Sequence, residues 1–202
     1  MFTQLRPAAV MLALMTLLTG ALYPLLVTGA SLLLFPHQAR GSLVVEEGRA
    51  VASELIGQCF SDPRVFWGRP SATTPNGCNA ASSNASNLGP TNPALVDAVK
   101  ARVRALREAD PGNAAPIPID LVTTSASGLD PHVSPAAALF QVPRVARLNL
   151  LEEARVRALV LAAVEPRTFG LLGEPRVNVV LLNRALQRLA HPPAHAGTNM
   201  RQ

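Results

Sequence analysis

The stretch AAVMLALMTLLTGALYPLLVTGASLLLF, Ala8 to Phe35, decides the fold, because it separates a membrane segment from the rest of the chain. It contains no charged residue and exceeds the roughly 20 residues that a helix needs to cross about 30 Å of hydrocarbon. A secretory signal peptide has a shorter apolar core, of about 7 to 15 residues, followed by a small-residue cleavage site. Neither feature matches this stretch. We therefore predict an uncleaved transmembrane helix over 8–35.

The charges on either side of this helix indicate its orientation. Arg6 and the amino terminus precede it, and residues of both signs follow it. Long domains cross a membrane largely regardless of their charge, so the short basic end should stay inside. We predict a short cytoplasmic N-terminus over 1–7, a soluble α/β domain over 36–190 that faces outward, and a disordered tail over 191–202.

The charge pattern beyond the helix argues against a nucleic-acid partner. Seventeen of the eighteen basic residues follow the helix together with all thirteen acidic residues, which is a mild basic excess. The arginines gather only in 101–108 and 152–158, at spacings typical of solvated helix faces. Aromatic residues make up only 4% of the chain, so few rings could stack on bases. No binding to nucleic acid is predicted.

Hydrophobic periodicity and breaker residues predict a mixed domain of short strands and helices. The predicted strands cover 42–48, 116–124 and 176–182, and the predicted helices cover 49–60, 93–110, 135–142 and 150–164, with a short closing helix after the last strand. This order fits a small mixed sheet covered by helices. The predicted fold class is α+β, with one N-terminal transmembrane helix followed by a single mixed α/β soluble domain.

Capping signals mark where three of these helices should begin. Asn92 followed by Pro93, and Ser134 followed by Pro135, are N-cap and first-turn pairs. Asn149 with Glu152 fits a capping box. The helix that begins after Ser134 is expected to break or kink at the proline at position 143.

A polar loop and two cysteines occupy the centre of the chain. Residues 68–93 are rich in Ser, Asn, Gly and Pro and show no apolar periodicity, which predicts a long ordered or semi-ordered loop. Cys59 and Cys78 are the only cysteines, and their spacing matches no metal-binding motif. Outside the membrane they could form a disulfide that stabilises the fold by about 3 kcal/mol. Two unrelated buried thiols fit the sequence equally well.

SASGLDPHVSP, residues 125–135, is the segment richest in reactive side chains. A membrane-anchored serine hydrolase would use Ser127 or Ser125 with His132 as the base, but the G-x-S-x-G elbow is absent. A phosphate cradle would use the Ser-Gly turn and the following helix start, but the chain has no P-loop motif. Asp120, Asp130 and His132 match no recognised metal spacing.

A connection without chemistry of its own accounts best for SASGLDPHVSP. In it the serines satisfy backbone groups, Gly128 adopts a conformation that other residues avoid, and Asp130-Pro131 sets a turn. Ser127, Gly128, Asp130 and Pro131 are then expected to fix a surface for docking or regulation.

Four sequence blocks in a fixed order resemble one known family. They are GQCFSDPRVFWGRPSAT, SNASNLGPTNP, PIDLVTTSASGLDPHVSPAAALFQVPRVAR and GEPRVNVVLLNRAL. Behind a single N-terminal membrane helix, they closely resemble the C subunit of the Kdp high-affinity potassium-transporting ATPase, from the anchor to about Leu189. No D-K-T-G phosphorylation motif is present, in agreement with a subunit that does not itself hydrolyse ATP.

The resemblance implies a non-catalytic accessory subunit of a potassium import pump in the bacterial inner membrane. Its expected partners are a channel-like A subunit, a P-type B subunit that hydrolyses ATP, and a very small F subunit. It implies a catalytic chaperone that raises the nucleotide affinity of the B subunit and helps assembly. The chain would bind no cofactor by itself, and would affect ATP only through the ATPase subunit.

The same blocks supply the candidate site residues, among which no catalytic residue and no metal ligand is predicted. Candidates for the nucleotide effect or for docking are Ser125, Ser127, Gly128, Leu129, Asp130, Pro131, Gln141 and Arg144. Candidates for docking, without a nucleotide effect, are Phe66, Trp67, Arg69 and Asn87. Together with Phe60, the residues Phe66 and Trp67 follow one another closely around the Asp62-Pro63 turn and could instead be core residues.

The sequence departs from the family pattern at three positions. Ala126 replaces the first glycine of the usual S-G-S-G, which weakens a phosphate cradle because alanine resists positive φ. Val65 replaces an aromatic residue, and Cys78 stands where a tyrosine often precedes asparagine.

Orientation and the expected nucleotide effect are in tension. An outward-facing domain cannot touch cytoplasmic ATP, so either the effect is indirect or the orientation is reversed. We favour an outward domain on the side of the A subunit where potassium enters.

Overall fold

The computed structural model describes residues 2–46 and 48–190. The tail over 191–202, for which disorder is predicted, lies outside the described residues. The chain divides into two compact units between Ser53 and Glu54, and each is described by itself.

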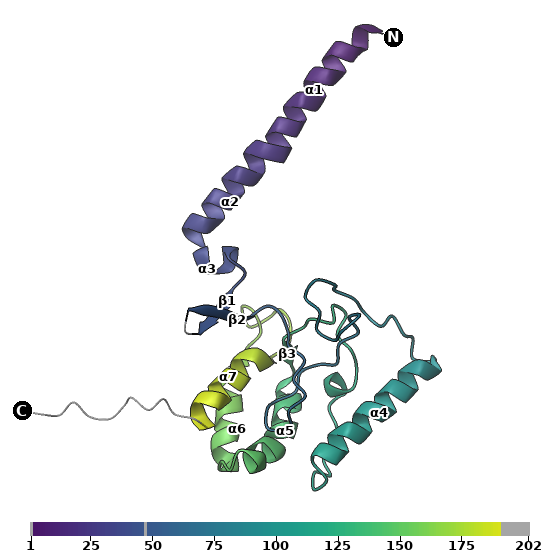
Figure 1. Ribbon diagram of the computed structural model, residues 1–202, viewed down its shortest axis with the longest axis vertical. Helices are drawn as coiled ribbons and strands as arrows, with labels where there is room; N and C mark the ends of the chain where they lie inside the picture. Colours follow the sequence, from purple (N-terminus) through teal and green to yellow (C-terminus); the bar gives the residue numbers. More distant parts are fainter. Residues whose placement is uncertain (1, 47, 191–202) are drawn as a thin grey trace, which may run out of the picture. The chain divides into compact units, whose positions relative to one another are not determined.

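The first unit is built around one long helical rod (Figure 1). Its helical segments are η1 Phe2–Gln4, α1 Leu5–Leu17, the π-helical turn η2 Leu18–Leu22, α2 Tyr23–Leu34 and α3 Pro36–Ala39. The 30 residues of Leu5–Leu34 are the one stretch of the described chain that is long and apolar enough to cross a membrane. None of them is buried, as expected of a helix that packs against lipid or other subunits. The candidate span begins three residues before the predicted one.

A β-hairpin completes the first unit and corrects one predicted element. β1 Leu43–Glu46 confirms the predicted strand and pairs antiparallel with β2 Arg49–Ser53, in the register Leu43 to Ser53. The helix predicted over 49–60 is therefore wrong. Gly48 has φ +78°, which turns the chain back, and cross-strand pairing then stabilises 49–53 in an extended form.

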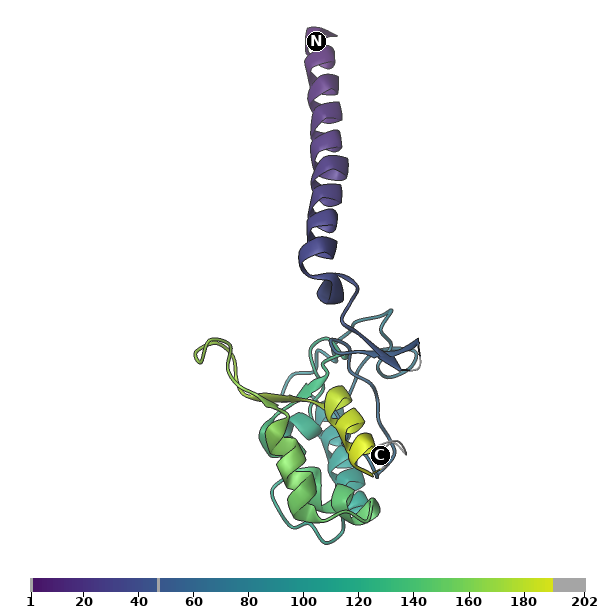
Figure 2. The same ribbon diagram turned by 90° about the vertical axis from the view of Figure 1, so that its left-hand side faces the viewer.

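The second unit contains a three-stranded antiparallel sheet in the order β3-β5-β4. The strands are β3 His132–Val133, β5 Arg176–Asn178 and β4 Val164–Glu165, with Val177 opposite both Val133 and Val164. The helices are α4 Pro93–Ala109, the short η3 Ile119–Leu121, α5 Pro135–Leu148, α6 Glu153–Ala162 and α7 Val179–Ala190. Helix α5 packs against α6, and α6 against α7, as the green and yellow helices of Figure 2 show.

The core of the second unit lies between these helices and the sheet. Its most buried side chains are Phe66, Ala137, Ala138, Val142, Val145, Val156, Val160, Val177, Val179, Leu182 and Leu186. Small β-branched residues and alanines dominate, so helices and strands approach closely with few aromatic side chains between them. A disulfide joins Cys59 to Cys78 and ties the segment before the core to the polar loop. It settles the choice between a disulfide and two free thiols.

The strand predicted over 116–124 is wrong. The segment forms only the 3₁₀ turn of η3, and the alternation expected of a strand is broken, since Ile119 is 74% exposed and Leu121 5% exposed. Pro116 and Pro118 carry no N–H groups and so cannot donate to a neighbouring strand. The strand that precedes α5 is instead β3.

The strand predicted over 176–182 ends after three residues. Asn178 accepts hydrogen bonds at its Oδ1 from the N–H groups of Val180 and Leu181, at 3.1 and 3.2 Å. This side chain satisfies the first free donors of α7, so the chain becomes helical at Val179. The apolar run is compatible with a strand or a buried helix, and the asparagine decides between them.

Two of the three predicted helix starts are confirmed. Asn92 accepts from Ala94 N–H and Ser134 accepts from Ala137 N–H, each followed by a proline in the first turn. The predicted capping box at 149–152 is wrong, because α6 begins at Glu153 with Glu152 at its N-cap and no side-chain cap. Helix α5 also runs on through Pro143 to Leu148, held by buried residues on both sides of the proline.

Candidate functional site

Two side-chain amides hold the candidate residues Phe66 and Trp67 in place. Asn183 of α7 accepts from Phe66 N–H at 2.8 Å and donates to its carbonyl at 2.9 Å. Gln141 of α5 accepts from Trp67 N–H at 2.8 Å and donates to the Trp67 carbonyl at 3.0 Å. An amide offers one acceptor and two donors, which matches the backbone of one extended residue. Phe66 is fully buried and Gln141 is 1% exposed, so these two predicted site residues, Phe66 and Gln141, lie inside the domain.

Arg144 is buried behind the Trp67 segment, with only 2% of its surface exposed. Its guanidinium carbon lies 4.4 Å from the centroid of the indole ring of Trp67. It donates to Gln141 Oε1 at 2.7 Å and to the Pro63 carbonyl. Burial lowers the pKa of Arg144 to about 10 from its ordinary value, which leaves it charged at neutral pH. Arg144 therefore stabilises the segment from inside.

Gly128 is the most constrained residue of the loop Ser125–Pro131. Gly128 has φ +69°, and a Cβ added there would lie 2.7 Å from Thr73 Cγ2 and 2.8 Å from the Asn84 carbonyl oxygen. Both the backbone conformation and the lack of space require glycine. Ser71 Oγ donates to the Gly128 carbonyl at 2.7 Å. The polar loop predicted over 68–93 thus closes over this segment.

Hydrogen bonds to backbone groups hold both serines of this loop. Ser127 Oγ accepts from Leu129 N–H at 3.1 Å, and the Ser127 carbonyl accepts from Asn84 N–H at 2.9 Å. Ser125 is 3% exposed, and its N–H donates to the Pro70 carbonyl at 3.3 Å. Ser127 thus satisfies a backbone group with its side chain, as expected of a shaped connection, whereas Ser125 is held through its backbone N–H.

Asp130 carries the main electrostatic feature of the loop. Its Oδ1 accepts from His132 N–H at 3.0 Å and lies 3.3 Å from His132 Nδ1, and its Oδ2 lies 3.5 Å from Arg69 Nη1. Desolvation by burial raises the pKa of Asp130, but the hydrogen bonds from His132 and the charge of Arg69 outweigh it and hold this pKa below its ordinary value. Asp130 is therefore ionised at neutral pH.

The residues of the hydrolase and metal hypotheses are not assembled into sites. In the part of the chain that the structure describes, no hydrogen bond joins His132 to Ser125 or Ser127, which nucleophilic activation would need. Asp120 accepts from Ser134 N–H at 2.7 Å and so supports the start of α5. Within residues 2–46 and 48–190, no three His, Cys, Asp or Glu side chains cluster closely enough to hold a metal ion.

The predicted site residues fall into three groups in the fold. Phe66, Trp67, Gln141 and Arg144 form one internal cluster. The loop residues meet Arg69 in an open pocket of about 540 Å³, lined by Leu55, Ile56, Arg69, Ser125, Ala126, Ser127, Leu129, Asp130 and Pro131. Asn87 stands apart from both, exposed and with φ +51°.

Sequence reasoning missed an exposed apolar hairpin between β4 and β5. Figure 2 shows this segment projecting from the second unit. Its turn carries Phe169, Leu171 and Leu172, which are 90%, 81% and 63% exposed. Thr168 and Leu172 pair across the turn through two backbone hydrogen bonds of 2.9 and 3.0 Å. The signal in the sequence is FGLLG, an apolar cluster between breakers outside any periodic element. We call Phe169, Leu171 and Leu172 the apolar tip.

Paired charges line the stem of this hairpin. Arg167 lies 2.7 Å from Glu174, and Arg176 lies 2.9 Å from Glu165. The pairs leave no net charge beside the apolar tip. Large apolar side chains exposed together in this way mark interaction surfaces.

Comparison with known proteins assigns the chain to a family. The sequence model of the family described as "KdpC: K+-transporting ATPase, c chain" matches residues 5–188. A protein of Methylococcus capsulatus named potassium-transporting ATPase KdpC subunit is 60% identical over 189 residues, which cover 94% of this chain and all of that protein. Proteins of the same name from Polaromonas naphthalenivorans and Sorangium cellulosum are each 62% identical, over 92% of this chain and 94% and 98% of theirs. With its candidate N-terminal span and its mixed α/β second unit, the chain belongs to the KdpC family of subunits of the K⁺-transporting ATPase.

Proposed function

We propose that this chain is a non-catalytic accessory subunit that helps to assemble the potassium pump and raises the ATP affinity of its P-type subunit. The observation that carries the proposal is how the loop Ser125–Pro131 is used. The Gly128 carbonyl accepts from the Ser71 hydroxyl, Ser127 Oγ accepts from Leu129 N–H, and the one acid of the loop, Asp130, is paired with His132 and Arg69. Such a segment shapes a domain for binding and does not supply a nucleophile or a base.

The second part of the proposal is that the second unit lies in the periplasm. The Cys59–Cys78 disulfide supports this placement, because disulfides persist in oxidising compartments and are rare in the cytosol. The basic residue Arg6 ahead of the span supports it too. The effect on ATP is then indirect and passes through the membrane helix and the neighbouring subunits.

We assign docking to the apolar tip, with the channel-like A subunit as its occupant. An anionic bilayer surface would be contacted best by unpaired basic residues around an apolar anchor. The arginines of this hairpin are instead neutralised by Glu174 and Glu165. Charge therefore favours an apolar recess on a protein over a lipid surface.

The nucleotide effect is tested on the purified complex. We expect the complex containing the wild-type chain to reach half-maximal ATPase activity at a lower ATP concentration than the complex prepared without it. The isolated chain should hydrolyse no ATP. An unchanged ATP dependence in the two preparations would remove the chaperone role and leave assembly alone.

Orientation is tested separately by fusing alkaline phosphatase after Gln202. An active fusion supports the periplasmic placement, because the reporter folds only where disulfides form. An inactive fusion, with a matching active cytoplasmic reporter, would reverse the assigned orientation.

A further inference from the structure

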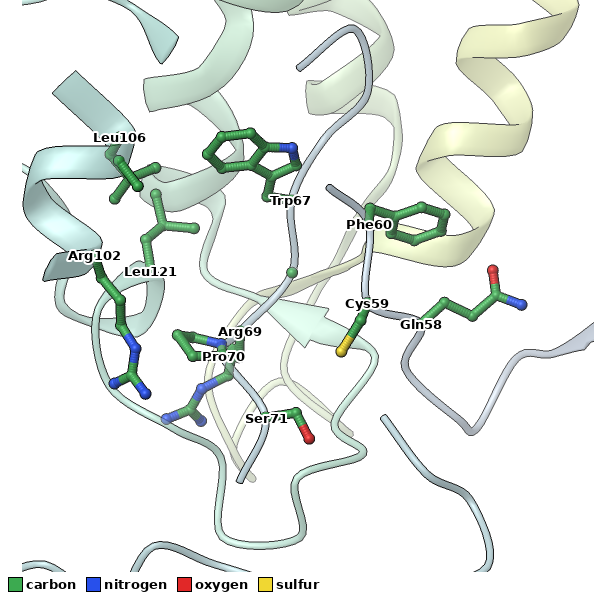
Figure 3. Close-up of a pocket in the computed structure, with 12 residues that line it drawn as sticks. Gln58, Cys59, Phe60, Trp67, Arg69, Pro70, Ser71, Arg102, Leu106 and Leu121 are labelled. Atoms are coloured by element: carbon green, nitrogen blue, oxygen red, sulfur yellow. The ribbon is translucent and has the colours of Figure 1, made fainter. Parts of the chain in front are cut away.

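A second pocket, which shares Arg69 with the pocket beside the loop Ser125–Pro131, has an apolar end and a cationic end. It has a volume of about 190 Å³ and lies between α4, η3 and the segment that follows the disulfide. Its apolar wall consists of Phe60, Trp67, Pro70, Ala105, Leu106 and Leu121, and its charged residues are Arg69 and Arg102 (Figure 3). In Figure 3 both guanidinium groups extend away from the indole of Trp67.

The two arginines are fixed next to each other by one loop. Arg102 Nη1 donates to the Val122 carbonyl at 2.8 Å, and Arg69 Nη2 donates to the Thr124 carbonyl at 3.2 Å. Val122 and Thr124 are two residues apart, so both guanidinium groups are held in place beside one short stretch of backbone. Rigid guanidinium forks lose less entropy when they bind an anion than free side chains do.

The hydrogen-bonding capacity of these groups is not used up. Arg69 Nε is buried and has no hydrogen-bond partner among the described residues. Within the same part of the chain, no carboxylate forms an ion pair with Arg102, and burial lowers the pKa of Arg102 without a compensating acid. A guanidinium stays protonated in proteins, so Arg102 keeps its charge.

The balance of charge limits what the pocket can hold. Arg69 and Arg102 contribute two positive charges, and Asp130, 3.5 Å from Arg69, contributes one negative charge. One positive charge is left over, which suits a monoanion better than a phosphate dianion. The volume of about 190 Å³ is below the roughly 300–1,000 Å³ of pockets for drug-sized ligands, so only a small group fits.

We propose that this pocket binds a carboxylate carried on a short apolar stem, with the carboxylate at Arg69 and Arg102 and the stem against Trp67, Leu106 and Leu121. The ligand is a small organic acid or an acidic side chain presented by a protein segment, which share this chemistry. The inference concerns a binding site and does not depend on the proposed effect on ATP.

The test uses the full-length chain in detergent, because Trp67 is its only tryptophan and lies in the pocket wall. The probes are phenylacetate, its neutral isostere phenylacetamide, and the capped peptide acetyl-Leu-Glu-Leu-amide. We expect a saturable change of Trp67 emission with at least one of the two carboxylates and none with phenylacetamide, which corrects for partition into micelles. Tighter binding of the peptide assigns the site to a protein segment, and tighter binding of phenylacetate assigns it to a free acid.

Matched variants on α4 locate the site. Arg102→Gln should weaken carboxylate binding by at least about tenfold, because a charge-assisted hydrogen bond is lost. Arg104→Gln, two residues along on the exposed face, should leave binding unchanged. If Arg102→Gln fails to fold, Arg102→Lys, which keeps the charge, takes its place in the comparison with Arg104→Gln. Equal binding of phenylacetate and phenylacetamide, no saturable change with either carboxylate, or equal affinity in the position 102 and 104 variants would overturn the proposal.

Discussion

The loop Ser125–Pro131 and the hairpin that carries the apolar tip are both connections rich in breakers, yet they are used in opposite ways. A Cβ at Gly128 would meet Thr73 at 2.7 Å, whereas a Cβ at Gly170 or Gly173 would meet nothing within 4 Å, although all three glycines have positive φ. The first loop is enclosed at Gly128, and the second leaves Phe169 90% exposed. Gly128 of the segment that best identifies the family is therefore part of the packed fold, whereas a less conspicuous segment leaves its apolar side chains exposed.

The largest expected effect separates the two kinds of glycine. Gly128→Ala should lower the free energy of unfolding by about 2–4 kcal/mol, because positive φ is strained for alanine and the added methyl group overpacks the loop. Gly173→Ala carries only the φ cost, about 1–2 kcal/mol. Urea unfolding of the two variants measures the difference. Equal losses would show that Gly128 is not enclosed.

The next effect concerns the amide that holds Phe66. Asn183→Ala should lower the free energy of unfolding by about 2–3 kcal/mol, because the buried N–H and carbonyl of Phe66 lose their partners. Gln187→Ala, one turn along α7 and exposed, should stay within about 0.5 kcal/mol of wild type. A similarly small loss in the Asn183 variant would mean that the backbone of Phe66 is satisfied in another way.

A smaller effect should be present at neutral pH and should be lost in acid. The pKa of Asp130 is lower in the folded chain than its ordinary value, so ionised Asp130 stabilises the fold at pH above its unfolded value of about 3.9. That contribution is lost as the pH falls through the folded pKa. Thermal unfolding between neutral pH and pH about 3 should show a steeper acid loss for wild type than for Asp130→Asn. Parallel curves would contradict the pairing with His132 and Arg69.

Local signals in the sequence predicted local structure well. Asn92-Pro93 and Ser134-Pro135 begin helices as expected, because the cap and the first turn are neighbours in the chain. The long apolar helix was equally readable, since its length and its lack of charged residues are visible in the sequence. The misassigned segment 49–53 is compatible with helix or strand, and its partner strand decides.

Contacts between distant residues could not be predicted in this way. Asn183 binds Phe66 across 117 positions, and Gln141 binds Trp67 across 74. No periodicity marks such pairs. The sequence left Phe66 open as a core or a docking residue and gave no sign that Gln141 is internal, and only the fold shows that both are buried. Arg69 was a candidate for docking, and only the fold places it beside Arg102 and Asp130.

The smallest effect on stability is expected at the apolar tip. The double variant Phe169→Ser, Leu171→Ser should unfold within about 0.5 kcal/mol of wild type, because both side chains are already exposed to solvent. Urea unfolding of the free chain measures this. A larger loss would mean that the tip packs against its own domain.

Co-purification of this double variant with the other pump subunits tests the central claim most directly. The chain is tagged, expressed with its partners, and purified in mild detergent, with Leu150→Ser, a single residue that is 95% exposed elsewhere in the second unit, as the matched control. We predict that the control retains the channel-like subunit at the wild-type ratio and that the double variant loses most of it. Full retention by the double variant would contradict the assignment of docking to the tip.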